Sequence, residues 1–150
     1  RFLDSKKSFM KIQSYSISYK EKLMDLAVGK ENIHFVGWLN NRGVYEHLAA
    51  SDIAVFPSSQ SIIWLQALAS HLPIIIGDFG NQSLDYLNEY GAVIELELEN
   101  INVKNFKREI EKQLIDENLR QGKLNAAKTA AKYLDWNNLI KKTLSHVEIS

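Results

Sequence analysis

Short runs of apolar residues recur along the chain, and they constrain its fold more than any other feature. Three of them lie at residues 52–56, 72–77 and 92–96, and stretches with helical spacing separate them. Strands that are apolar throughout must be covered on both faces, and intervening helices provide that cover in a parallel sheet. The pattern therefore predicts an α/β fold with a doubly wound parallel sheet.

Two further strands are expected earlier in the chain, at residues 9–15 and 32–37. Between them, residues 19–28 should form a helix that Gly29 ends. Asn40 or Asn41 should cap the next helix. The remaining helices are expected at residues 61–70, 83–90, 103–116, 117–134 and 136–147. Gly122 is expected to break the helix in which it lies.

Composition excludes several classes of protein. A chain of 150 residues forms about one domain. Its 18 basic and 18 acidic residues cancel, which argues against nucleic-acid binding driven by bulk charge. Without cysteine it has no disulfide, thiolate metal site or cysteine nucleophile. The apolar runs are far shorter than the ~18 residues of a membrane span. Because the chain starts at Arg1, we expect it to be part of a longer protein.

Ligands bind outside the carboxyl ends of the strands in such a sheet. Four loops qualify, at residues 16–18, 37–42, 57–61 and 77–83. The third loop is small and polar and leads directly into a helix, so its backbone N–H groups suit a diphosphate. Its serines could equally well serve only to cap that helix. The fourth loop contains Gly80, which would let the backbone approach a ligand closely.

An ordered set of motifs is similar to a known family. The runs SDIAVFPS (residues 51–58) and QALASHLPII (residues 66–75) come first, flanked by NIHFVG (residues 32–37). Gly80-Asn81, Gly91-Ala92-Val93 and Asp135-Trp136 follow in the same order. The set resembles the carboxyl-terminal domain of the retaining glycosyltransferases of family 4 (group 1). These enzymes have two Rossmann-like domains, an arrangement known as the GT-B fold.

The resemblance implies that residues 1–150 form a domain that binds a nucleotide-diphosphate sugar. A missing amino-terminal domain would hold the acceptor, with transfer in the cleft between the two. The candidate donor-binding residues are Ser58, Ser59, Gln60, Ser61, Gln66, Gly80, Asn81 and Trp38. Trp38 could stack on the base or pack against the missing domain. No cofactor is expected.

No metal site is expected either. The four histidines are not paired at ligand spacing, and the sequence contains no Asp-x-Asp motif. The resemblance points the same way, because these enzymes work without a metal bound by such a motif.

The sequence departs from the family pattern at two functional positions. Gln66 stands where the family has the second of two glutamates, thought to bond the ribose hydroxyls. The first would fall at Ser58, but the intervening loop is shorter than in the family. The carboxylate that usually contacts the donor sugar is therefore missing or supplied elsewhere, and the catalytic residues stay unassigned. At a helix end, His71 replaces the usual glycine, where a left-handed residue is common.

The expected function is donor binding and glycosyl transfer to a saccharide or lipid-linked acceptor in bacterial surface polysaccharide synthesis. We expect a cytoplasmic location, with any contact to the inner face of the membrane made through the missing domain. Alternatives are a related GT-B enzyme (an N-acetylglucosaminyltransferase or a sugar-nucleotide epimerase) and a non-catalytic flavodoxin-like module. A phosphate-receiver domain is disfavoured, because Asp52 begins its strand and Asp78 stands alone.

Overall fold

The computed structural model describes residues 19–57, 61–80 and 84–145. The chain divides into two compact units, Arg1–Trp38 and Leu39–Ser150. In the first unit residues 19–27 form a helix. Gly29 follows with a φ of 75°, which confirms that it ends this helix. The strand expected at residues 9–15 lies outside the described residues.

The strand predicted at residues 32–37 is wrong. Residues 33–37 have no regular secondary structure, and Ile33, Phe35 and Val36 are about half exposed. A strand exists only when a neighbour accepts and donates its backbone hydrogen bonds. The described residues of the first unit contain no strand to do so. Apolar patterning alone was therefore a poor guide here.

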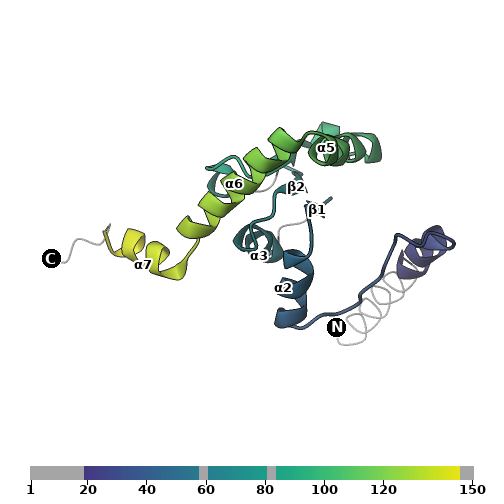
Figure 1. The fold of residues 1–150 in the computed structure, drawn as a ribbon, viewed down its shortest axis with the longest axis horizontal. Coiled ribbons are helices and arrows are strands. Elements are labelled where there is room, and N and C mark those ends of the chain that lie inside the picture. The colour runs from purple at the N-terminus through teal and green to yellow at the C-terminus, as the bar shows by residue number, and fades with distance from the viewer. Residues whose placement is uncertain (1–18, 58–60, 81–83, 146–150) are drawn as a thin grey trace, which may run out of the picture. The chain divides into compact units, whose positions relative to one another are not determined.

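The second unit is built on a parallel sheet in the order β1 (Ala54–Phe56), β2 (Ile74–Gly77) and β3 (Val93–Leu96). The helix α2 (Asn41–Ala49) precedes it, and α3 (Ile63–Ala69) and α4 (Asp85–Asn88) connect its strands. After the sheet come a 3-10 turn (Leu98–Asn100), α5 (Val103–Ile115), α6 (Glu117–Tyr133) and α7 (Trp136–Ser145). Figure 1 labels most of these elements. The α/β class is confirmed, with three of the five expected strands found in the described part of the chain.

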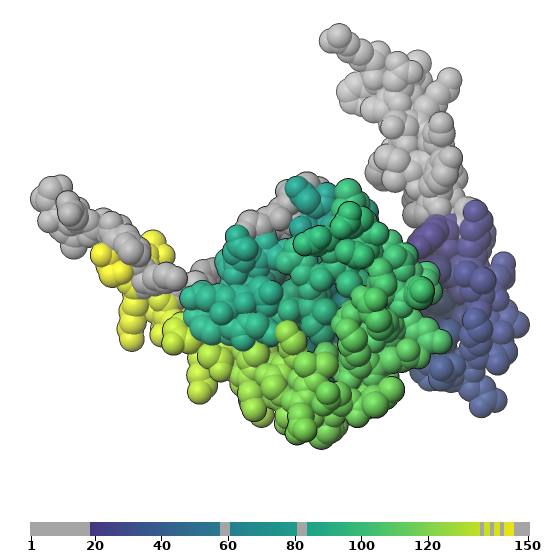
Figure 2. Space-filling model, turned by 90° about the horizontal axis from the view of Figure 1, so that it is seen from above, coloured from purple at the N-terminus to yellow at the C-terminus, as the bar shows by residue number. Residues whose placement is uncertain are grey.

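Helices cover both faces of the sheet, as the doubly wound prediction requires. On one face Ile74 and Ile76 are fully buried in a cluster with Trp64 and Leu68 of α3 and Ala127 of α6. Ile75 points to the opposite face, since side chains alternate along a strand. There α5 packs against β2 and β3. Figure 2 shows the green atoms of α5 and α6 lying against the teal atoms of the sheet region.

The edge strand β1 is less well covered. Within the described residues it pairs with β2 alone. An apolar groove of about 630 Å³ lies between β1 and α5, lined by residues such as Val55, Ile101, Phe106 and Ile110. This end of the sheet therefore leaves apolar surface and strand backbone uncovered by the described part of the second unit.

The helix boundaries show which local signals were effective. Asn40 caps α2, because its Oδ1 accepts the backbone N–H of Gly43 at 2.8 Å. Asp116 likewise caps α6 by accepting the N–H of Leu119 at 3.0 Å. The break predicted at Gly122 is wrong, because α6 continues through it. Glycine costs a helix only about 1 kcal/mol, and the buried Ala127 on the next turns holds α6 on the core.

Among the described helices, none is long and apolar enough to cross a membrane.

Candidate functional site

The carboxyl ends of the three strands meet at one edge of the sheet. The strands are parallel and in register, with Phe56 beside Ile76 and Ile76 beside Glu95. The loops that follow β1 and β2 therefore begin next to each other. They are the loops that the sequence selected at residues 57–61 and 77–83.

Gly77 brings these two loops into close contact. A Cβ atom at this position would lie 2.4 Å from the carbonyl oxygen of Pro57 and 3.2 Å from Cδ1 of Ile101. Real Cβ atoms do not approach a backbone oxygen so closely, so no larger residue fits without moving the backbone. The absence of a side chain at the end of β2 thus sets the spacing of the site.

The helix after β1 starts later than expected. It begins at Ile63 rather than Ser61, and its N-cap residue, Ile62, forms no side-chain cap. Ser61 instead contacts the first turn: its Oγ lies 3.5 Å from the N–H of Ile63, and its carbonyl oxygen accepts the N–H of Trp64 at 3.1 Å. Ser61 therefore already satisfies part of this helix end. Ser58, Ser59 and Gln60 lie outside the described residues.

Gln66 lies in the middle of α3 and is half-buried. Its backbone is part of the helix: its N–H donates to Ile62 and its carbonyl oxygen accepts from Ser70. Its side-chain amide makes no hydrogen bond to another described residue. A partly buried amide usually has a partner, so this side chain retains both donor and acceptor capacity.

The loop after β2 bends at Gly80, which has a φ of 75°. Its backbone N–H donates to Oδ1 of Asp78 at 2.9 Å, and the intervening Phe79 is 44% exposed. This left-handed conformation favours glycine. The loop therefore presents an apolar ring beside a bent backbone. Asn81 lies outside the described residues.

A carboxyl pair at this edge was missed by the sequence analysis. The backbone N–H of Asp78 donates to Leu96 at 2.8 Å, which places Asp78 beside the end of β3. Burial raises the pKa of Glu95 above its usual value, and the negative charge of Asp78 and a hydrogen bond with it raise that pKa further. The prediction that Asp78 stands alone is wrong, because the strand register brings Glu95 to it.

The remaining expectations concern Trp38 and metals. Trp38 belongs to the first unit, and its side chain is fully exposed. In the part of the chain that the structure describes, no three histidine or acidic side chains gather as a metal site would require.

Comparison with protein families bears on the chemistry of this edge. The family model described as "Glycosyl transferases group 1" matches residues 12–116, more than half of the chain. The chain belongs to the group 1 glycosyltransferases. The match to this glycosyltransferase family includes all three strands and both strand-end loops, and it ends just after α5. It confirms the resemblance over residues 32–116, whereas the Asp135-Trp136 motif lies beyond it. Comparisons with curated proteins and with solved structures found no match.

Proposed function

We propose that this chain binds a nucleotide-diphosphate sugar at the carboxyl edge of its sheet and forms the donor-binding half of a retaining glycosyltransferase. A second Rossmann-like domain would bind the acceptor. The observation that carries the proposal is the half-buried amide of Gln66, without a described partner, on the helix that follows β1 in a chain of this family. An unpaired amide there is suited to bond ribose hydroxyls.

The transfer itself would break the bond between the anomeric carbon and the diphosphate. The oxygen of an acceptor hydroxyl would bond to that carbon, the nucleoside diphosphate would depart with the electron pair, and one of its phosphate oxygens would take the hydroxyl proton. The group that needs support is therefore the departing anion. Backbone N–H groups of the loops at residues 57–61 and 77–83 would serve this role, because they donate without carrying a charge of their own. Those of Asp78 and Gly80 are not among them, since they already donate to Leu96 and Asp78. The seven-residue α3 adds little through its dipole.

The Asp78 and Glu95 pair offers a replacement for the missing carboxylate. Family members usually have two glutamates where this chain has Gln66 and a shortened loop. A carboxylate accepts two or more hydrogen bonds, which matches the vicinal hydroxyls of a sugar. We therefore assign to this pair the recognition of donor-sugar hydroxyls. The acceptor we propose is a saccharide or a lipid-linked saccharide of a bacterial surface polysaccharide, used on the cytoplasmic side of the membrane.

Nucleoside-diphosphate binding tests the proposal. Calorimetric titrations of the 150-residue chain with UDP, GDP and ADP should identify one that binds. Gln66→Leu should then weaken binding about 5- to 150-fold, because the ribose hydroxyls lose partners worth about 1–3 kcal/mol. Gln66→Glu should preserve or strengthen binding, since its bonds are charge-assisted. Sugar transfer by this chain alone is not expected, because only one wall of the cleft would be present.

Gln121→Leu is the matched control. Gln121 lies on the exposed side of α6 and donates to Glu117 at 2.8 Å, far along the chain from the strand-end loops. It should bind like the parent chain. If none of the three nucleotides binds, or if folded Gln66→Leu binds as well as the control, the proposed ribose contact is wrong.

A further inference from the structure

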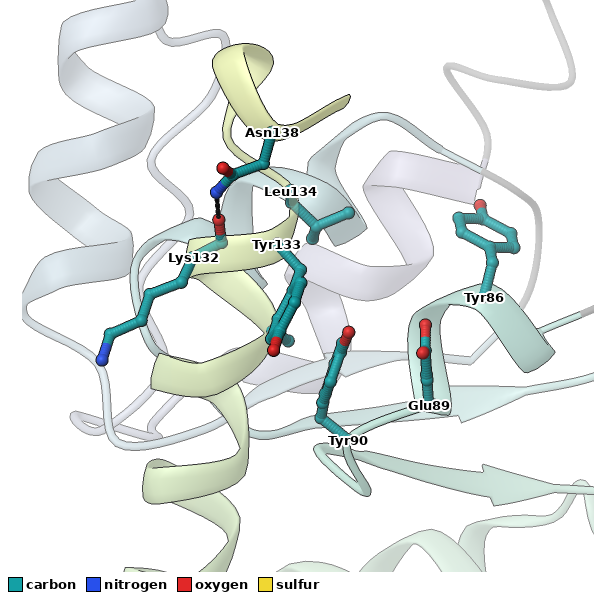
Figure 3. Close-up of a pocket in the computed structure, with 8 residues that line it drawn as sticks. Tyr86, Glu89, Tyr90, Lys132, Tyr133, Leu134 and Asn138 are labelled. Atoms are coloured by element: carbon teal, nitrogen blue, oxygen red, sulfur yellow. Dashed lines mark hydrogen bonds between the residues drawn. The ribbon is translucent and has the colours of Figure 1, made fainter. Parts of the chain in front are cut away.

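A second hollow lies beside α4. It has a volume of about 540 Å³ and is formed by α4 with the turn after it, the end of α6, and α7. Tyr90 precedes β3, so it marks the amino edge of the sheet. This volume is typical of a site for a small molecule or one unit of a larger one. None of the donor-site candidates that the structure describes lines it (Figure 3).

Tyrosine rings dominate its surface. Tyr90 and Tyr133 stack with their ring centres 4.6 Å apart and their planes within 9°. Tyr133 is nevertheless 56% exposed, and Tyr86 across the hollow is 51% exposed. Figure 3 shows Tyr86 on α4 facing the space that Leu134 and the stacked pair border from the other side. Two elements far apart in sequence thus hold aromatic surface open to a ligand.

Polar groups surround these rings at fixed positions. Partial burial raises the pKa of Tyr90, and the charge of Glu89 and a hydrogen bond with it raise that pKa further, so the hydroxyl stays protonated. Asn138 donates its amide N–H to the carbonyl oxygen of Lys132, which anchors the start of α7 over the end of α6. Figure 3 shows the Lys132 amine extending away from the rings. Among the described residues, a carboxylate, hydroxyls and an amide therefore line the hollow, and the amine of its cationic lining residue, Lys132, points away from the rings.

These features select one class of ligand. A carboxylate without a facing cation disfavours phosphates and other anions. A purely apolar chain is disfavoured as well, because it would leave this carboxylate and the tyrosine hydroxyls without hydrogen-bond partners. A pyranose ring has C–H groups on its faces, which suit the negative face of a tyrosine ring. It has hydroxyls on its rim, which suit carboxylate and amide oxygens. The lining matches both parts of such a ring.

We propose that this hollow is a second saccharide site that holds one pyranose unit of a neutral glycan chain. It goes beyond the proposed donor site, because no described residue of that site lines it. Its effect would be to keep a glycan near the enzyme between transfers, which raises the effective concentration of that glycan.

Titration with three neutral trisaccharides (maltotriose, cellotriose and chitotriose), monitored by NMR, tests the proposal. At least one should shift signals of residues that line the hollow. Tyr86→Ala should weaken that binding about tenfold, because an aromatic platform is lost. Tyr45→Ala is the control: this tyrosine is 44% exposed on α2 and does not line the hollow. It should bind like the parent chain.

Three outcomes would overturn the proposal. They are no binding of any trisaccharide, binding that shifts other signals, and equal loss in both tyrosine variants. Nucleoside-diphosphate titration of Tyr86→Ala keeps the two proposals distinct, because this variant should retain the affinity of the parent chain. A loss of nucleotide binding by Gln66→Leu, in turn, should leave trisaccharide binding unchanged.

Discussion

Replacing His71 with glycine should make the folded chain more stable. It is the residue after the C-cap of α3 and has a φ of 65°. Its N–H donates to Leu68 at 2.9 Å, and the N–H of Leu72 donates to Ala67 at 3.0 Å. This pair of bonds is the Schellman motif, which places a left-handed residue at this position.

The magnitude follows from two opposing effects. A residue with a Cβ loses about 1–2 kcal/mol in the left-handed region. Glycine removes this strain, but its greater freedom in the unfolded chain costs about 0.4–1 kcal/mol. Because the His71 side chain is exposed, little packing is lost. His71→Gly should therefore raise the free energy of unfolding by about 0.5–1 kcal/mol, or the melting temperature by about 1–4 °C.

Urea unfolding followed by circular dichroism measures the change. His47→Gly is the matched control, since His47 is also exposed but lies within α2. There glycine should lower the free energy of unfolding by about 0.5–1 kcal/mol. The two variants should thus differ in sign. If His71→Gly is less stable than the parent chain, the strain argument is refuted.

Two further predictions concern the strand-end edge. Gly77→Ala should destabilise the chain by about 1–3 kcal/mol in urea unfolding, because its Cβ would meet the oxygen of Pro57. Gly122→Ala is the control: its Cβ meets nothing within 4 Å, so it should stabilise the chain by about 0.5–1 kcal/mol. If the two alanine variants change the free energy of unfolding equally, the proposed clash at Gly77 is refuted. The raised pKa of Glu95 means that the folded chain binds its proton more tightly than the unfolded chain does. Ionised Glu95 should therefore lower the free energy of unfolding as the pH rises above about 4.5. Glu95→Gln should be more stable than the parent chain at pH 7 and equal to it below pH 4. A constant difference for Glu95→Gln across this range would refute the explanation.

Local sequence signals predicted most of the second unit. Apolar runs identified its three strands, and the pair Asn40-Asn41 identified the start of α2 because a cap depends on residues close in sequence. The left-handed residue at His71 followed from the family pattern for the same reason. These features need only a few neighbouring residues, so one sequence is enough to find them.

Features that depend on distant contacts were harder to predict. The segment at residues 33–37 looks like a strand, yet strand formation depends on a partner that the segment does not contain. The Asp78 and Glu95 pair depends on the register between β2 and β3. Helix α6 passes through Gly122 because the core holds it, although local propensity favours a break. In each case tertiary packing decided the result.

The exposed side of β1 has a consequence for handling this chain. A strand with one unpaired edge offers its backbone N–H and C=O groups to any extended peptide. Within the described part of the second unit this strand is apolar and has an open groove beside it, so a second chain that reached it would gain both hydrogen bonds and buried surface. With only three residues, however, β1 offers few such bonds. Association through this edge should therefore be weak and should increase with protein concentration, so dilute samples suit equilibrium measurements.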